Sequence, residues 1–264
     1  MRRRESFDEV AELYELARPT YPTALIDDLV QFASLSKKSR ALEIGCGTGQ
    51  LTLPLAERGT SIMAVELGAN LAAVARRKLA RFENVTLVVA DFDRWVLPEE
   101  PFDLVVAATA FHWLRPESRV HACADALRPG GTLAIVQTHW SAGSGRDRFF
   151  EEGQRCYASW DTDYDPDFAP VTRDALPNTN DEMESSGRFD QFLLRRYDTE
   201  DRYTASQYSD LLATFSNIRG LDERARSGLL GCLAHLIDTR FGGSVVRKHC
   251  YSLWLARTPL AASA

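Results

Sequence analysis

The sequence of 264 residues lacks the cysteine patterns that mark disulfide-rich or zinc-binding proteins. Its five cysteines, Cys46, Cys123, Cys156, Cys232 and Cys250, are scattered and form no C-x-x-C pair. An odd number at such spacings favours neither a disulfide framework nor a zinc knuckle. We therefore expect reduced, mostly buried thiols and no metal site.

Long hydrophobic runs are also missing. The longest, at 104–110, is far too short for a bilayer, which needs about 20 apolar residues. The basic start at 1–4 is followed by acidic residues, where a signal peptide would have its apolar segment. These patterns predict a cytoplasmic protein with no membrane partner.

Positive charge is in deficit, with 31 Lys and Arg against 37 Asp and Glu and a formal net charge of -6. No long basic run follows Arg4, which argues against nucleic acid as a partner. The hydrophobic content of 45% and charged content of 26% are typical of a globular protein. The length fits one large α/β domain, or a core with a lid.

From residue 40, short apolar runs alternate with helical patterns. The runs lie at 41–44, 62–65, 85–89, 102–108 and 132–136, and the helical patterns at 50–58, 69–81 and 116–127. Short runs that are apolar on both faces are typical of buried parallel strands. With right-handed crossovers they predict an α/β fold with a Rossmann-like, doubly wound sheet.

A glycine-rich loop follows the first predicted strand. It has the sequence Glu43-Ile44-Gly45-Cys46-Gly47-Thr48-Gly49, and the second strand ends at Glu66. Glycines allow a tight turn and let a ligand approach main-chain N–H groups. A carboxylate one strand away can accept both hydroxyls of a ribose. The sequence therefore predicts a nucleoside-binding site at the carboxyl ends of the strands.

Two departures from dinucleotide motifs narrow the choice of nucleoside. A G-x-G-x-x-G loop would need glycine at Gln50, and no Gly-Lys-Ser/Thr follows, so the loop is not built for pyrophosphate. Glu43 would repel a phosphate but could hold the ammonium group of an amino acid. A ligand in which adenosine is joined to an amino acid would satisfy both carboxylates, with its ribose at Glu66 and its ammonium group at Glu43.

Further motifs occur in order along the chain. They are 41–49, Val65-Glu66, Ala90-Asp91-Phe92, 102–105, Phe111-His112-Trp113 and 127–131. Together they resemble the class I S-adenosylmethionine-dependent methyltransferases over about residues 40–137. The Phe-His-Trp motif and the segment from Tyr14 to Pro22 are similar to the small-molecule branch that includes trans-aconitate-type enzymes. The resemblance implies a mostly parallel seven-stranded sheet whose last strand is antiparallel.

The resemblance also implies S-adenosyl-L-methionine as the cofactor, with a defined set of contacts. The methionine part would contact Glu43, Gly45, Gly47 and Gly49, the ribose would contact Glu66, and the adenine amino group would contact Asp91. Leu67 and Phe92 would flank the ring, and Tyr14 and Arg18 would complete the cofactor site. Asp91 alone would also fit a helix cap.

The domain organisation follows from these assignments. We expect an N-terminal helical cap at 1–35, the cofactor-binding core at 36–140, an inserted lid at 141–187, and a C-terminal completion of the sheet with helices at 188–264. The insert is polar but rich in aromatic residues, which is typical of a lid over a small, partly apolar molecule.

Methyl transfer from a sulfonium needs a close, aligned acceptor in a dry site and no covalent enzyme intermediate. His112, after the fourth strand, is predicted to act as a base or to position the acceptor, and His139 is an alternative base. We expect O-methylation of a carboxylate or hydroxyl on a small molecule, by a monomer or homodimer. Arg18, Arg173 and Arg188 are candidates for binding an acceptor carboxylate, but the sequence favours ordinary surface arginines at these positions.

Two other functions remain open at this point. An NAD-dependent oxidoreductase would share the loop and Glu66, but it predicts glycine at Gln50 and leaves Glu43 and Asp91 unexplained. A non-catalytic module that binds a nucleoside or S-adenosylmethionine would share every motif, because fold and cofactor motif do not establish turnover. Binding of S-adenosylhomocysteine but not NAD would exclude the first, and methyl transfer would exclude the second.

Overall fold

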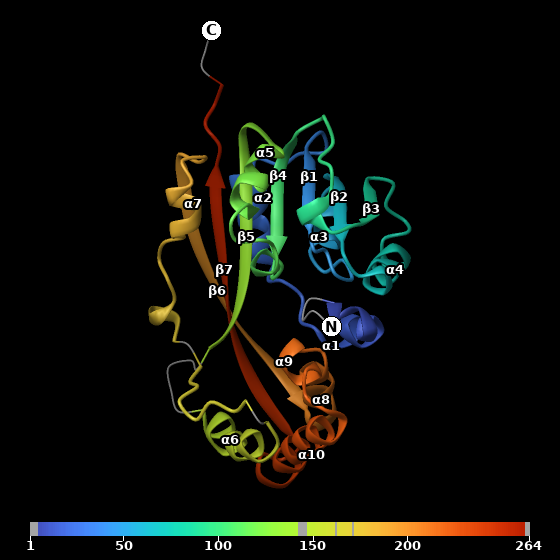
Figure 1. Ribbon diagram of the computed structural model, residues 1–264, viewed down its shortest axis with the longest axis vertical. Helices are drawn as coiled ribbons and strands as arrows, with labels where there is room; N and C mark the ends of the chain where they lie inside the picture. Colours follow the sequence, from blue (N-terminus) through green and yellow to red (C-terminus); the bar gives the residue numbers. More distant parts are fainter. Residues whose placement is uncertain (1–4, 142–146, 162, 171, 262–264) are drawn as a thin grey trace. The chain divides into compact units, whose positions relative to one another are not determined.

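The structure is a computed structural model that describes residues 5–141, 147–161, 163–170 and 172–261 (Figure 1). The chain forms two compact units, each assembled from three stretches. Unit 1 combines Met1–Pro19, His139–Leu176 and Asp198–Cys250, and unit 2 combines Thr20–Thr138, Pro177–Tyr197 and Tyr251–Ala264. Both the predicted cap, 1–35, and the predicted lid, 141–187, contribute residues to the two units.

The described strands form one seven-stranded sheet in the order β3-β2-β1-β4-β5-β7-β6. Their bounds are β1 (Arg40–Ile44), β2 (Ser61–Glu66), β3 (Val85–Val89), β4 (Phe102–Ala108), β5 (Leu127–Ser141), β6 (Gln191–Thr204) and β7 (Ser244–Arg257). β1 to β5 pair in parallel. β7 is antiparallel, because the N–H of Thr258, directly after β7, donates to Gly131 O near the start of β5 (2.9 Å). The predicted fold class is confirmed.

Helices cover both faces of the parallel strands in unit 2. Successive side chains of a strand point to opposite faces. In β4, Leu104 and Val106 therefore share a buried cluster with α2 (Thr23–Phe32) and α3 (Thr52–Glu57), whereas Val105 and Ala107 share one with α5 (Arg119–Asp125). α4 (Ala69–Lys78) packs against β2 and β3. The remaining short helices of this unit are η3 (Phe92–Arg94), η4 (Phe111–Trp113) and α7 (Asp181–Ser185).

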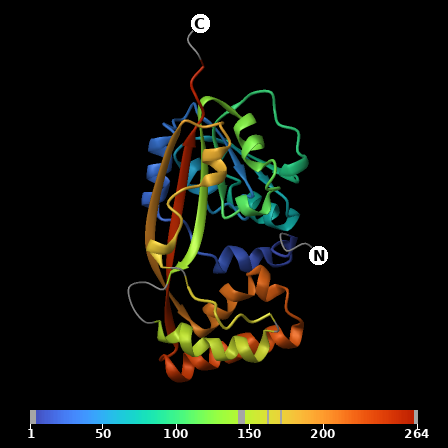
Figure 2. The ribbon, with the colours of Figure 1, turned by 60° about the vertical axis from the view of Figure 1, so that its left-hand side comes forward.

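Unit 1 is built mainly from helices, which Figures 1 and 2 show gathered together. α10 (Glu223–Arg240) packs against α6 (Arg148–Trp160) and α8 (Ala205–Ala213), and α8 packs against α1 (Ala11–Ala17). α1 ends where Arg18 becomes extended, because the residue before a proline disfavours helical geometry. The other helices of this unit are η2 (Asp8–Val10), η5 (Arg173–Ala175) and α9 (Ser216–Arg219).

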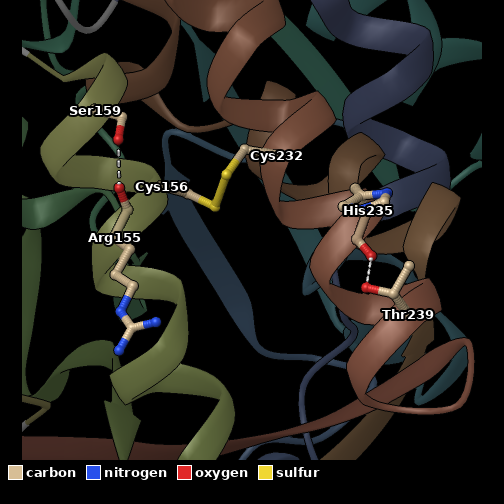
Figure 3. Close-up of a disulfide and its surroundings, with 6 residues drawn as sticks. All are labelled: Arg155, Cys156, Ser159, Cys232, His235 and Thr239. Carbon is tan, nitrogen blue, oxygen red and sulfur yellow. Dashed lines mark hydrogen bonds between the residues drawn. A yellow bond between two sulfur atoms is a disulfide. The ribbon is translucent and has the colours of Figure 1, made fainter.

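A disulfide joins Cys156 in α6 to Cys232 in α10 (Figure 3). The expectation of reduced thiols is therefore wrong for this pair, whereas Cys46, Cys123 and Cys250 are buried and form no disulfide. The two bonded cysteines are 76 residues apart in the chain. No local spacing marks them, because only the packing of α6 against α10 brings them together.

Among the described residues, no helix has the length and apolar character needed to cross a membrane. Within those same ranges, no group of three or more His, Cys, Asp or Glu side chains is arranged to hold a metal ion.

Candidate functional site

The glycine-rich loop follows β1, where the strand order reverses between β1 and β4. In open parallel sheets, ligands bind at the carboxyl ends of the strands beside such a reversal. Gly45, Gly47 and Gly49 have φ angles of 68°, 57° and 85°. A Cβ on Gly45 would lie 2.6 Å from the Cβ of Ala110, so only glycine lets the loop pack this closely against the end of β4.

Glu66 anchors this loop from the end of β2. Its Oε2 accepts a hydrogen bond from the N–H of Gly47, and its Oε1 accepts one from the N–H of Gly68, both at 2.8 Å. The side chain is buried, so these charge-assisted bonds act in a region from which water is largely excluded. They fix the carboxylate in one orientation at the predicted ribose position.

Glu43 is the second acidic group, and it is almost completely buried on β1. The hydroxyl of Thr52 donates to its Oε2 at 2.7 Å. Burial raises the pKa of Glu43 from 4.5 to about 8, an effect that the Thr52 hydrogen bond opposes and the Glu66 charge reinforces. Glu43 is therefore mainly protonated at neutral pH, and a neighbouring cation would favour its ionised form.

Asp91 follows β3 and lies beside the end of β2, since the N–H of Ala90 donates to Glu66 O (2.9 Å). Its Oδ1 accepts from the N–H of Asp93 at 3.3 Å and caps η3. The capping role is thus present, and the contact with adenine stays a prediction. Phe92 is buried against the sheet, and Leu67 is half-buried after β2.

His112 lies in η4, directly after β4. Ala110, two residues earlier, is the residue against which Gly45 packs, so η4 begins beside the glycine-rich loop. The His112 ring reaches solvent on one side, and its centroid lies 4.7 Å from that of Trp113. Partial burial, together with the positive charge of Arg119, lowers the pKa of His112 below 6.5. The imidazole is therefore neutral near pH 7 and able to accept a proton.

Sequence reasoning missed three features of the same region. Thr52, the partner of Glu43, follows the loop without any motif of its own. Thr109 has a φ of 52°, which is unusual for a β-branched residue, and its Oγ1 lies 3.3 Å from the Tyr21 hydroxyl. The Oγ1 of Thr48 and the Nε2 of Gln50 are buried and have no hydrogen-bond partner in the described part of the chain.

These unpartnered atoms show how the loop suits a polar ligand. A buried polar group without a partner costs about 1–3 kcal/mol, so a ligand that supplies partners is favoured at this loop. The carboxyl groups of Glu43, Glu66 and Asp91 match an ammonium group, a pair of hydroxyls and an exocyclic amine, respectively. The residues present therefore fit S-adenosylmethionine.

Tyr14 and Arg18 belong to unit 1, as do the candidates His139 and Arg173, whereas the other predicted site residues belong to unit 2. Arg18 donates through Nε and Nη2 to Oγ1 and O of Thr214, at 2.8 and 2.9 Å, and its guanidinium lies 4.3 Å from the centre of the Phe215 ring. It thus has a structural role in unit 1, and its contact with the cofactor stays a prediction. Arg173 and Arg188 form ion pairs with Asp198 and Asp125.

Comparison with known proteins identifies the family. The sequence profile of the methyltransferase domain family matches residues 41–131. An uncharacterized methyltransferase of Geobacillus is 30% identical over 154 residues, which make up 57% of this chain and 70% of that protein. An uncharacterized methyltransferase of Mycobacterium tuberculosis is 34% identical over 131 residues, or 50% of this chain and 51% of that protein. The chain belongs to the class I S-adenosylmethionine-dependent methyltransferases.

The chain spans about half the length of the mycobacterial relative. Among solved structures, a phosphoethanolamine N-methyltransferase of Haemonchus contortus, in complex with phosphomonomethylethanolamine and S-adenosylhomocysteine, has a TM-score of 0.55. It is 17% identical, and the match covers 96% of this chain and 57% of that chain. This likeness concerns the fold. The cofactor of the family is S-adenosylmethionine, not NAD.

Proposed function

We propose that the protein transfers the methyl group of S-adenosylmethionine to a small-molecule acceptor. The observation that carries the proposal is the convergence of Glu43, the Glu66-anchored loop and the start of η4 at the carboxyl ends of β1, β2 and β4. The cofactor supplies an already activated methyl group. Glu43, the loop, Glu66 and Asp91 would hold it, so that catalysis consists mainly of orienting the acceptor and excluding water.

O-methylation of a carboxylate or hydroxyl is the reaction that His112 suits. A hydroxyl acceptor must lose its proton, and the neutral imidazole of His112 can take that proton at Nε2 or Nδ1. A carboxylate is already ionised at neutral pH, so His112 would only position it. The likeness to trans-aconitate-type enzymes stays a prediction, as does the small size of the acceptor. A small acceptor is supported by the Haemonchus enzyme, whose complex contains phosphomonomethylethanolamine.

The proposed function is tested by incubating the protein with S-adenosylmethionine and a panel of small carboxylates and alcohols. Formation of S-adenosylhomocysteine that depends on one acceptor is the expected result. Tight binding of S-adenosylhomocysteine without turnover on any acceptor would instead favour the non-catalytic binding module.

Glu66→Ala should weaken the binding of S-adenosylhomocysteine by about 1.5–3 kcal/mol, or roughly 10- to 150-fold. The substitution removes a charged acceptor at the ribose position, and it also releases the N–H groups of Gly47 and Gly68. Isothermal titration calorimetry measures the change. Glu117→Gln, at an exposed carboxylate of the same unit, is the control and should bind as the wild type does. Equal affinity in a folded Glu66→Ala variant would contradict the assignment.

Binding of S-adenosylmethionine at pH 7 should release a proton from Glu43. The free protein holds this carboxyl protonated because its pKa is about 8, and an ammonium group beside it would lower that pKa. Affinity should therefore rise as the pH increases from 6 towards 8. Calorimetry in two buffers with different ionisation enthalpies counts the released protons. Glu43→Gln should release none, and the same count in this variant would show that the proton comes from another group.

A further inference from the structure

Unit 1 contains a cavity of about 320 Å³ that the cofactor motifs do not explain. It lies between α6, α8, α10, Asp161 and the segment 163–168, and Arg247 of β7 lines it as well. Its walls are largely aromatic, with contributions from Trp140, Phe149, Phe150, Tyr157, Tyr208 and Phe215. This volume and apolar lining are those of a small-molecule pocket, in which a few polar groups fix the orientation of the ligand.

Arg247 is a positively charged lining residue, and its side chain is only 3% exposed. Its Nη1 donates to Oδ2 of Asp147 at 3.0 Å, and its guanidinium lies 4.3 Å from the centre of the Trp140 ring. The other carboxylate oxygen of Asp147 accepts from the N–H of Phe150 at the start of α6. Asp147 is thus shared between a helix cap and the arginine.

The ion pair with Asp147 does not use all the hydrogen-bond donors of Arg247. A guanidinium carries five N–H donors, and the Nε–H of Arg247 is buried without a partner among the described residues. An unpaired donor on a buried cation is costly, whereas a planar carboxylate accepts two parallel bonds from the same guanidinium. The wall therefore favours a ligand that carries an anionic, planar group.

The cavity is also lined by three acidic side chains. Asp161, Asp163 and Asp165 line it, and Phe168, which is 56% exposed, lies beside the Phe150 ring. Asp161 and Asp165 each accept one backbone N–H bond, at 3.0 and 2.9 Å, from the residue two positions further on. These carboxylates would repel a second negative charge on a ligand. The cavity therefore favours a ligand with one anionic group over a polyanion.

We propose that this cavity binds a small monocarboxylate with a flat, apolar body, and that Arg247 holds the carboxylate. The aromatic walls contact the body of the ligand. The guanidinium donates hydrogen bonds to the carboxylate from N–H groups that do not bond to Asp147. The lining aspartates discriminate against dicarboxylates, tricarboxylates and phosphate monoesters, which carry more than one negative charge. The binding site belongs to unit 1 and requires neither S-adenosylmethionine nor turnover.

Calorimetry on the full chain, without cofactor, tests the proposal with three probes. We expect 3-phenylpropionate to bind at least 10-fold more tightly than 3-phenylpropionamide, which has the same shape without the charge. We expect tricarballylate, a tricarboxylate, to bind more weakly than 3-phenylpropionate. Equal binding of the acid and the amide, or tighter binding of tricarballylate, would overturn the proposal. Either result would leave the proposed methyl transfer untouched, because no cofactor is present.

Two variants locate the binding. Arg247→Lys keeps the charge beside Asp147 but loses the planar fork, so it should weaken binding of the acid about 10-fold and leave the amide unchanged. Gly153→Leu should abolish binding of the acid, because a Cβ there meets only Leu233 Cδ2, at 3.4 Å, and both residues line the cavity. Gly231→Leu, on an exposed helical face with no atom within 4 Å, is the matched control. Wild-type affinity in folded Gly153→Leu would show that the acid binds elsewhere.

Discussion

Replacing His112 with alanine should lower the turnover of a hydroxyl acceptor by ~10²–10⁴-fold, because a positioned base contributes about that much to proton removal. Affinity for S-adenosylhomocysteine should change little, since the residues that fit the cofactor are elsewhere in the site. The wild-type rate should fall as the pH decreases through the pKa of His112, which lies below 6.5. The rate of S-adenosylhomocysteine formation between pH 5 and 8 measures both effects.

A carboxylate acceptor would change this result in a defined way. His112→Ala should then have a smaller effect, mainly on the KM of the acceptor, because no proton has to be removed. His121→Ala, at an exposed histidine of α5, is the matched control and should keep wild-type kinetics. Wild-type turnover of His112→Ala at every pH would show that His112 neither accepts a proton nor positions the acceptor.

Reduction of the Cys156–Cys232 disulfide should lower the free energy of unfolding by about 2–4 kcal/mol. The bond closes a long loop of chain and joins α6 to α10, so its loss frees the unfolded chain without removing the packing of the folded helices. Urea denaturation with and without dithiothreitol measures the difference. The double variant Cys156→Ala/Cys232→Ala should be less stable and should not respond to dithiothreitol. A response of that variant would assign the effect to the other cysteines.

The parallel core could be predicted from the sequence because its strands contain short runs that are apolar on both faces. The glycine loop and Glu66 could be placed for the same reason, since each directly follows a recognisable strand. β5 is longer than the predicted run, 132–136. Its start pairs with β4 through Leu127 and Phe102, and Gly130 and Gly131 form hydrogen bonds with Pro259 and Thr258, directly after β7. The apolar run alone could not show these contacts, because both partners are distant in the sequence.

Unit 1 could be predicted less well. Phe149, Gly153 and Cys156 recur at helical spacing in α6, but the glycine and the polar neighbours weaken that signal. The buried side of β7 carries Val245, Arg247 and His249, and an arginine in such a sequence is easily taken for a surface residue. The closure of 141–187 over a bound molecule and the cytoplasmic location both stay predictions. Disulfides are rare in the cytosol, so the bond in unit 1 weighs against that location.

The path of the chain through the two units has a practical consequence for dissecting the protein. Because each unit draws on three separate stretches, no single cut yields either of them whole. A fragment with the bounds of the family match, 41–131, would lack α2 and β7, which cover one face of the core and extend its sheet. Such a fragment would expose apolar surface that is buried in the intact protein, and we expect it to aggregate rather than to bind the cofactor.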